Sequence, residues 1–330
     1  MHFRSLADLQ KAILANLHRI PADVDLIVGI PRSGMLPATL AALALNIQLT
    51  DVGGFHAGQI MGSGRTRRRS RDKPFGDLRH ALVIDDSIDS GGSMREAREF
   101  ISGAGHDMQV TYCAVYGAEL DSPDADLIFE QVDKPRIFEW NVMHHGMLSC
   151  ACVDIDGVLC HDPTGEENDD GKAYEAFLQH ARPLFTPTKP IATLVTSRLE
   201  KYRPQTERWL ADRGIEYEKL VMLDLPDAAT RRRLGAHGTF KAEVYKSMGT
   251  ARLFIESELW QAKKIAEVSG KPVLCMDGPV MCYPGALNAR GMLQRARQSP
   301  RVRALVARLI GQRNYDAVVR RFGRPADAAP

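Results

Sequence analysis

The stretch ALVIDDSIDSGGSM (81–94) contains residues whose types and spacing could hold a phosphorylated sugar. Asp85 and Asp86 end an apolar run, and Asp89 stands directly before a Ser-Gly-Gly-Ser turn at 90–93. Ligands of an open parallel sheet bind beyond the carboxyl ends of its strands. The turn can surround a phosphate with backbone N–H groups and serine hydroxyls, while the carboxylates accept hydrogen bonds from a diol. Ribose 5-phosphate has both features, so the stretch predicts a site for it.

A second acidic stretch has a different design. In CACVDIDGVLC (150–160), Asp154 and Asp156 follow another apolar run, but no anion-enclosing turn comes after them. The sequence therefore predicts two sites of different chemistry, each at the end of a buried strand.

Composition limits the classes of protein to consider. The chain has 330 residues, of which 44% are hydrophobic and 25% charged, and this suits two globular domains. The formal net charge of +2 gives no general affinity for polyanions, so any basic site must be local. We expect no transmembrane segment, since no apolar run reaches 18 residues, and no signal peptide, since the first 20 residues have helical spacing. Six cysteines without a CxxC pair favour buried thiols, and the cytoplasm is the expected location.

Short apolar strands alternate with helices along most of the chain, which predicts an α/β protein with two doubly wound domains, each with a mainly parallel sheet. The pattern pauses near residues 135–148. We therefore predict a first domain at 1–140, a second at 149–285 and a basic helical segment at 286–330. The expected strands are 24–30, 47–52, 80–85, 108–116, 149–154, 191–196, 219–223, 251–255 and 272–276, and the expected helices are 34–46, 92–103, 172–182, 203–213, 241–248 and 258–269.

The first half resembles type I phosphoribosyltransferases. ALVIDDSIDSGGSM is similar to their motif for phosphoribosyl pyrophosphate (PRPP), and VGIPRSGMLPA (28–38) is similar to their pyrophosphate-binding turn. The resemblance implies that Asp85 and Asp86 hold the ribose hydroxyls and help to place Mg²⁺. In purine-using members, an aspartate at the position of Asp89 acts as a base near the acceptor, while capping of the loop is the alternative. The further implied substrate-binding residues are Arg32, Ser33, Gly34, Ser90, Gly91, Gly92 and Ser93.

A basic segment, HAGQIMGSGRTRRRSRDKP, lies between these two motifs, where the family has a mobile loop. Its cations suit a pyrophosphate leaving group, because they offset the charge that builds on the departing oxygens. We assign Arg67 to catalysis on this basis. A solvated loop or a nucleic-acid patch is the alternative for the whole set, which is Arg65, Arg67, Arg68, Arg69 and Arg71.

The second half resembles phosphatases of the haloacid dehalogenase (HAD) superfamily, through CVDIDGVLC. The resemblance implies that Asp154 is the nucleophile that accepts a phosphoryl group. It also implies that Asp156 is first a general acid and then a general base. Gly157 would let the chain turn away sharply. An acid at position 156 favours phosphatase chemistry over dehalogenase or ATPase chemistry.

The later HAD motifs follow in order along the chain. Thr196 in ATLVTSR matches the phosphate-binding hydroxyl, with Ser197 and Arg198 next to it. Lys241 matches the cation of the third HAD motif, and Lys246 is the competing candidate for that role. SRLEKYRPQTERWL resembles the polynucleotide-type branch of these phosphatases, and the short segment before it leaves no room for a large cap.

The fourth HAD motif departs from the family pattern, because Glu256 stands where aspartates usually hold magnesium. Its carboxylate still offers hard oxygen atoms to Mg²⁺, and Glu258 is a possible partner. The implied metal ligands are Asp154, Asp156 and Glu256.

The segment 286–324 has ten arginines against one acid, Asp316. A solvated helix that packs on the second domain is one interpretation. A docking surface for an anionic acceptor, a lipid headgroup or a partner is the other.

The two chemistries fit in series, because phosphoribosyl transfer leaves a 5-phosphomonoester and an aspartyl phosphatase removes one. We therefore expect net ribosylation of an acceptor, which could be a base, a nucleoside-like molecule or a glycan. Base salvage with an independent nucleotide or phosphomonoester hydrolase is one alternative. A PRPP-sensing module without transfer is another. Acceptor contacts lie on variable loops, so the sequence does not name the acceptor.

Overall fold

The computed structural model describes residues 1–62 and 73–285. The chain forms two compact units, Met1–Asn141 and Val142–Pro330. The basic segment with Arg67 and the region 286–330 fall outside the described residues, so the predictions made for them remain predictions.

The first unit is built on a five-stranded sheet with the strand order β3-β2-β4-β5-β6. All of its strand pairs are parallel. A separate parallel pair joins the two short strands β1 and β7. The strands are β1 (His2–Arg4), β2 (Leu26–Gly29), β3 (Gln48–Asp51), β4 (His80–Ser87), β5 (Gln109–Gly117), β6 (Leu127–Gln131) and β7 (Arg136–Phe138).

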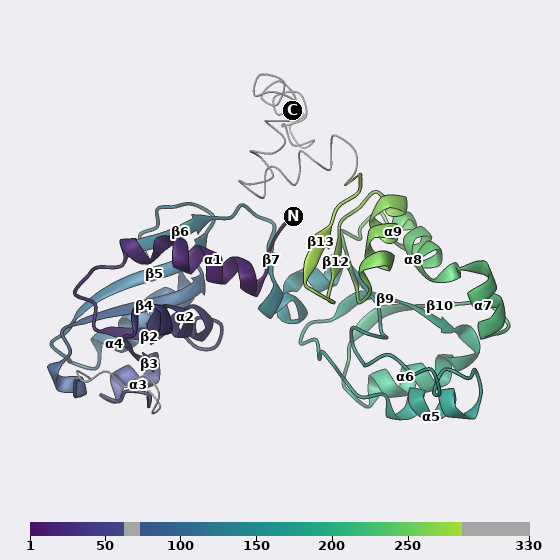
Figure 1. Ribbon diagram of the computed structural model, residues 1–330, viewed down its shortest axis with the longest axis horizontal. Helices are drawn as coiled ribbons and strands as arrows, with labels where there is room; N and C mark the ends of the chain where they lie inside the picture. Colours follow the sequence, from purple (N-terminus) through teal and green to yellow (C-terminus); the bar gives the residue numbers. More distant parts are fainter. Residues whose placement is uncertain (63–72, 286–330) are drawn as a thin grey trace, which may run out of the picture. The chain divides into compact units, whose positions relative to one another are not determined.

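Helices cover both faces of this sheet (Figure 1). Successive residues of a strand point to opposite faces, and β4 shows the result: Leu82 packs with α1 and α2, while Val83 packs with α3 and α4. An apolar run buried on both faces is the pattern expected of a central parallel strand. The helices are α1 (Leu6–Asn16), α2 (Met35–Leu45), α3 (Val52–His56) and α4 (Gly92–Ser102), with 3₁₀ turns η1 (Leu17–Arg19), η2 (Phe75–Asp77) and η3 (Glu139–His144).

The second unit has a six-stranded sheet with the order β10-β9-β8-β11-β12-β13. Only β13, at the edge, is antiparallel to its neighbour among the pairs described. The strands are β8 (Ala151–Val153), β9 (Ile191–Leu199), β10 (Tyr217–Leu223), β11 (Leu253–Glu256), β12 (Val273–Cys275) and β13 (Val280–Cys282).

Helices α8 and α9 share one core cluster with the sheet of the second unit, and α5 and α6 contact each other elsewhere in that unit (Figure 1). Buried Tyr245 of α8 and Ile265 of α9 belong to this cluster. The remaining elements are α5 (Lys172–His180), α6 (Arg203–Ala211), α7 (Ala228–Leu234), α8 (Ala236–Ser247) and α9 (Leu259–Ser269), with the 3₁₀ turns η4 (Gly146–Cys150) and η5 (Glu200–Tyr202).

The predicted α/β alternation with mainly parallel sheets is confirmed in both units. The connection at 135–148, where the predicted alternation pauses, contains β7, η3 and part of η4. Strand β8 is shorter than predicted, since η4 takes up residues 149 and 150. The edge strands β6 and β13 and the short helices α3 and α7 were not predicted. All six cysteines are free thiols. Among the described helices, none is long and apolar enough to cross a membrane.

Candidate functional sites

The loop between β4 and α4 forms the first site. Asp85 and Asp86 lie near the carboxyl end of β4 and are 8% and 3% exposed. They line a cavity of about 250 Å³ together with Ser33, Asp89, the loop 90–93 and Asn141. The structure thus brings together most of the residues predicted to bind PRPP. Arg32 is exposed and Gly34 is buried, and neither is part of the cavity wall.

Gly34 allows the turn after β2 to lie against the acidic pair. A Cβ atom at this position would come within 2.9 Å of Oδ1 of Asp85 and 2.5 Å of the carbonyl oxygen of Ile30. Any larger residue would therefore push the turn away from Asp85, which explains why glycine stands there.

The part of the site predicted to bind the 5-phosphate is the start of α4. Gly91 has a left-handed backbone with φ of 75°, and a Cβ atom there would collide with the carboxylate of Asp124. Asp124 is held in place by a 2.6 Å ion pair with Arg95 of α4. The loop 90–93 leads directly into the N-terminus of α4, an 11-residue helix whose first N–H groups favour an anion.

Burial raises the pKa of Asp85 to about 8, and the neighbouring charge of Asp86 adds to this effect. Near pH 7 the carboxyl group of Asp85 therefore keeps its proton in the absence of a ligand. The Asp85 Oδ1 atom accepts a hydrogen bond of 2.8 Å from the backbone N–H of Asp86. A cation or a set of hydroxyl donors at this site would favour the ionised form.

Trp140 in η3 contacts the first site and was not predicted. Its Nε1–H donates a 2.7 Å hydrogen bond to Oδ2 of Asp86. Its ring stacks on Phe138 at 5.1 Å, and Phe138 stacks on Tyr116 at 5.4 Å. The sequence placed Trp140 in the connection between the domains. No local pattern there indicated that the chain returns to β4.

Asp89 lies at the open side of the first cavity and is 65% exposed at its side chain. It forms an ion pair with Lys134, and the guanidinium of Arg136 lies 3.7 Å away. These contacts are compatible with a base held near an acceptor and with a residue that fixes the loop. Both alternatives for Asp89 therefore stay open.

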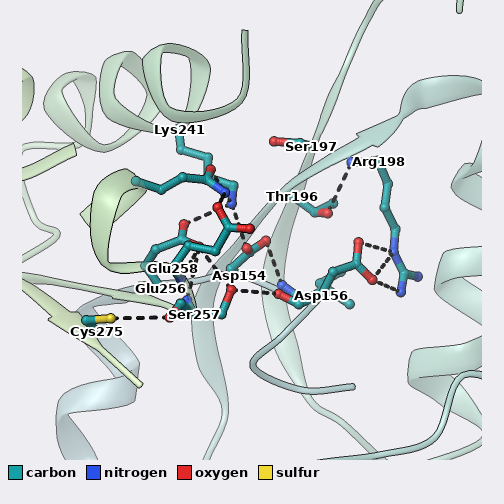
Figure 2. Close-up of polar contacts among 12 residues, drawn as sticks. Asp154, Asp156, Thr196, Ser197, Arg198, Lys241, Glu256, Ser257, Glu258 and Cys275 are labelled. Atoms are coloured by element: carbon teal, nitrogen blue, oxygen red, sulfur yellow. Dashed lines mark hydrogen bonds and ion pairs between the residues drawn. The ribbon is translucent and has the colours of Figure 1, made fainter. Parts of the chain in front are cut away.

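Neighbouring strands β8 and β11 bring the acids of the second site together. Asp154 directly follows β8 and Glu256 ends β11, and these strands pair in parallel. Lys241 of α8 points between the two carboxylates (Figure 2). Its Nζ atom lies 2.6 Å from Oδ2 of Asp154, 2.8 Å from Oε2 of Glu256 and 3.2 Å from Oε1 of Gln261. Lys246, the competing candidate, is exposed near the end of α8.

The pKa values in this cluster reflect one buried cation between two buried carboxylates. Burial raises the pKa of Asp154, the ammonium of Lys241 counteracts this, and the charge of Glu256 adds to it. Burial would lower the pKa of Lys241, but the two carboxylates outweigh it and raise that pKa. Lys241 therefore stays protonated and holds Asp154 in position.

Asp156 is held by Arg198 from β9 (Figure 2). The Nη2 atom of Arg198 lies 2.6 Å from Oδ1 of Asp156, and Nε lies 3.1 and 3.0 Å from its two oxygens. Burial opposes ionisation of Asp156, yet the charge and hydrogen bonds of Arg198 outweigh it and lower the pKa of Asp156. The side chain of Asp156 is 19% exposed, while Arg198 is fully buried. Arg198 therefore contacts Asp156, where the sequence predicted a substrate contact.

A cavity of about 290 Å³ is lined by Asp154 and Asp156. Ser197 and Lys241, two of the predicted substrate-binding residues, line it, whereas Thr196 is fully buried and is not part of the wall. The wall also contains residues that the sequence analysis did not assign, because no motif or spacing marks them: Asp162, Asn168, Tyr174, Arg231, His237 and Gln261.

The residues of the second site do not form a magnesium site as they are arranged. Oε2 of Glu256 contacts Lys241, and Oε1 accepts a 3.0 Å hydrogen bond from the backbone N–H of Ser257. Glu256 does not line the cavity, whereas Glu258 does. Within residues 1–62 and 73–285, no three His, Cys, Asp or Glu residues are grouped closely enough to hold a metal ion.

Comparisons with known proteins bear on the first unit. Residues 3–147 match the family model of the phosphoribosyl transferase domain. This match supports a type I phosphoribosyltransferase domain in that part of the chain, which is less than half of its length. No curated protein matches the chain.

Several solved structures are similar to parts of the chain. Xanthine-guanine-hypoxanthine phosphoribosyltransferase of Helicobacter pylori is 17% identical over 43% of this chain and 93% of its own, with a TM-score of 0.33. The purine phosphoribosyltransferase of Pyrococcus horikoshii is 19% identical over 42% and 92%, with a TM-score of 0.30. A chain of the Pnkp1/Rnl/Hen1 complex is 16% identical over 79% and 96%, with a TM-score of 0.24. At these identities and TM-scores, no residue role is taken from any of them.

Proposed function

We propose, from the phosphoribosyltransferase domain in residues 3–147, that the chain transfers ribose 5-phosphate from PRPP to an acceptor and then removes the 5-phosphate. The observation that carries this proposal is the presence of two cavities in one chain. One joins the acidic pair of β4 to a phosphate-directed loop. The other places a buried lysine on an aspartate that can act as a nucleophile.

In the first reaction, a nucleophilic atom of the acceptor bonds to C1 of the ribose, and the bond from C1 to pyrophosphate breaks. Pyrophosphate leaves with the bonding electrons. The carboxylates of Asp85 and Asp86 hold the ribose hydroxyls, and the loop 90–93 holds the 5-phosphate. Mg²⁺ would offset the negative charge of the pyrophosphate group, and Asp85 and Asp86 would help to hold it. Asp89 is the candidate base for the acceptor proton.

The turn 32–34 is proposed to hold the pyrophosphate group. Ser33 reaches the cavity and Gly34 brings the turn against Asp85. Arg32 is exposed in this turn and is proposed to contribute its positive charge to the same group. Arg67 lies outside the described residues, and its proposed role on the leaving group rests on the sequence.

In the second reaction, an oxygen of Asp154 bonds to the phosphorus atom of the 5-phosphate, and the sugar oxygen leaves and takes a proton from Asp156. Water then attacks the aspartyl phosphate, gives a proton to Asp156, and releases inorganic phosphate. This is HAD-type phosphatase chemistry. Its support is the order of the motifs along the chain, the parallel pairing of the strands that carry Asp154 and Glu256, and the contact of Lys241 with Asp154.

The geometry makes Asp156 a better base than acid in the ligand-free protein. Arg198 stabilises the ionised form of Asp156, so the carboxylate must gain a proton before it can assist the leaving alcohol. Binding of an anionic phosphoester near Asp156 would raise its pKa, because a neighbouring negative charge disfavours ionisation. Substrate binding would thus prepare the acid for the first half-reaction.

The acceptor remains a base, a nucleoside-like molecule or a glycan, and a cytoplasmic location and a docking role of residues 286–330 stay proposals. Independent salvage and hydrolase activities are the main alternative, and a PRPP-sensing module is the other. Incubation of the full chain with labelled PRPP, Mg²⁺ and a metabolite or cell-envelope extract separates transferase from sensor. A transferase releases pyrophosphate in step with PRPP consumption. A sensor binds PRPP and consumes none, which would contradict the proposal.

A further inference from the structure

Arg231 on α7 is a buried cation in the wall of the second cavity. It is 6% exposed, and within the described residues no carboxylate oxygen lies within 4.0 Å of its guanidinium nitrogens. Its Nη1 donates a 2.8 Å hydrogen bond to the carbonyl oxygen of Ser197, and Nη2 lies 3.5 Å from Oδ1 of Asn168. Its Nε–H has no acceptor. The two hydrogen-bond acceptors of this guanidinium are thus neutral, while the carboxylates of the same cavity wall lie more than 4.0 Å from its nitrogen atoms.

A buried charge without a counterion is costly, and a buried N–H without an acceptor adds to the cost. Buried cations in folded proteins are therefore normally paired. The other two buried cations near this cavity follow that rule: Lys241 contacts Asp154 and Glu256, and Arg198 contacts Asp156. Arg231 departs from it, and an unsatisfied group at a cavity wall points to a ligand.

Ser197 supplies a second unsatisfied group beside Arg231. Its side chain is 8% exposed, its Oγ has no hydrogen-bond partner, and it lines the same cavity. In Figure 2 no dashed line joins Ser197 to any of the residues drawn. His237 also lines the cavity, and burial together with the charges of Arg231 and Lys241 lowers the pKa of His237. The charges of Glu258 and Glu256 act on His237 in the opposite direction.

We propose that Arg231 and Ser197 form a subsite for a phosphate oxyanion in the cavity of the second unit. The guanidinium supplies the charge and N–H donors, and the serine hydroxyl supplies one more donor. The inference rests on the proposed phosphatase function for the identity of its ligand. The oxyanion is either the phosphate that Asp154 attacks or a neighbouring phosphate of the same substrate.

Binding of inorganic phosphate to the full chain, measured by titration calorimetry without added metal, tests the subsite. Arg231→Gln should weaken phosphate binding by about tenfold or more, because a charge-assisted contact is lost. Arg232→Gln is the matched control, since Arg232 is exposed on the same helix and carries the same charge. It should change the affinity less than about twofold. None of these substitutions lies in the first unit, so we expect phosphate binding at the loop 90–93 to be the same in every variant. The difference between isotherms then reports on the second cavity.

Ser197→Ala keeps the test decisive if Arg231→Gln does not fold. The Ser197 hydroxyl has no hydrogen-bond partner among the described residues, so its removal should leave the thermal midpoint unchanged or raise it. A purely structural role predicts unchanged phosphate binding in this variant, whereas the subsite predicts an affinity several-fold lower. Wild-type phosphate affinity in both Arg231→Gln and Ser197→Ala, or in Ser197→Ala alone if the other variant unfolds, would overturn the proposal.

Hydrolysis assays then identify the source of the oxyanion. If Arg231 contacts the phosphate that Asp154 attacks, Arg231→Gln lowers kcat/KM equally for ribose 5-phosphate and ribose 1,5-bisphosphate. If it contacts a neighbouring phosphate, only the value for the bisphosphate falls. Both outcomes support the subsite. Phosphate binding needs no turnover, so a wild-type protein that binds phosphate through Arg231 but hydrolyses nothing would contradict the proposed function and leave this inference standing.

Discussion

The Nζ atom of Lys241 lies 2.6 Å from Oδ2 of Asp154, and both side chains are almost fully buried. The same ammonium contacts Glu256 at 2.8 Å, so one cation compensates two buried carboxylates. Removal of one partner of a buried ion pair leaves an uncompensated charge. This contact therefore ties the stability of the second unit to the position of its proposed nucleophile.

We expect Lys241→Met to lower the free energy of unfolding by about 3–5 kcal/mol and to abolish phosphomonoester hydrolysis. Chemical denaturation and a phosphate-release assay measure the two effects. Lys246→Met is the control, because Lys246 lies on the same helix but is exposed. It should change neither quantity appreciably. Equal unfolding free energies and equal hydrolysis rates in the two variants would show that the contact of Lys241 with Asp154 supports neither stability nor activity.

Asp85 should make the stability of the protein depend on pH. Its pKa is raised from 3.8 to about 8 in the folded protein, so between these values the folded state keeps a proton that the unfolded state has lost. The resulting stabilisation is complete below about pH 4 and is lost as the pH rises through about 8. Asp85→Asn should therefore flatten the decline in unfolding free energy across this range. A wild-type and a variant curve with the same slope between pH 5 and 8 would contradict the raised pKa.

Gly91 and Gly92 should respond differently to substitution by alanine. Gly91 has a positive φ and no space for a Cβ atom beside Asp124, whereas a Cβ atom at Gly92 would lie an ordinary 3.6 Å from Oγ of Ser90. We expect Gly91→Ala to cost about 1–3 kcal/mol of stability and to weaken PRPP binding, because the loop must shift. Gly92→Ala should have nearly wild-type stability. Thermal unfolding and PRPP calorimetry of the two variants measure these effects. Equal losses in Gly91→Ala and Gly92→Ala would contradict a strain that is confined to Gly91.

The sequence was sufficient to predict the strands that carry the two sites, because buried parallel strands are continuous apolar runs that end in polar residues. It placed Asp85 at the end of β4, Asp154 after β8 and Lys241 on the helix that faces Asp154. It also favoured Lys241 over Lys246, and the geometry brings Lys241 to the carboxylates. These assignments depend on local patterns, which one sequence contains.

Contacts between distant segments were not predictable in the same way. Trp140 reaches Asp86 across 54 positions of the chain, and Arg231 reaches Ser197 across 34. Three consecutive arginines, 231–233, look equivalent in the sequence, yet only Arg231 is buried. Which of these arginines is buried depends on how the short helix α7 packs on the rest of the unit, and no local sequence pattern indicates this packing. The pairing of Arg198 with Asp156 was missed for the same reason.

Whether the two cavities act in series is the central claim, and the mass of the product tests it most directly. Asp154→Asn, supplied with labelled PRPP, Mg²⁺ and an extract that contains the acceptor, should still release pyrophosphate. Its product should be heavier than the wild-type product by one phosphate group. The double variant Asp85→Asn with Asp86→Asn should make neither product but should remove the phosphate from the product isolated from Asp154→Asn. If wild type and Asp154→Asn yield the same phosphorylated product, the two sites do not act in sequence and the account is contradicted.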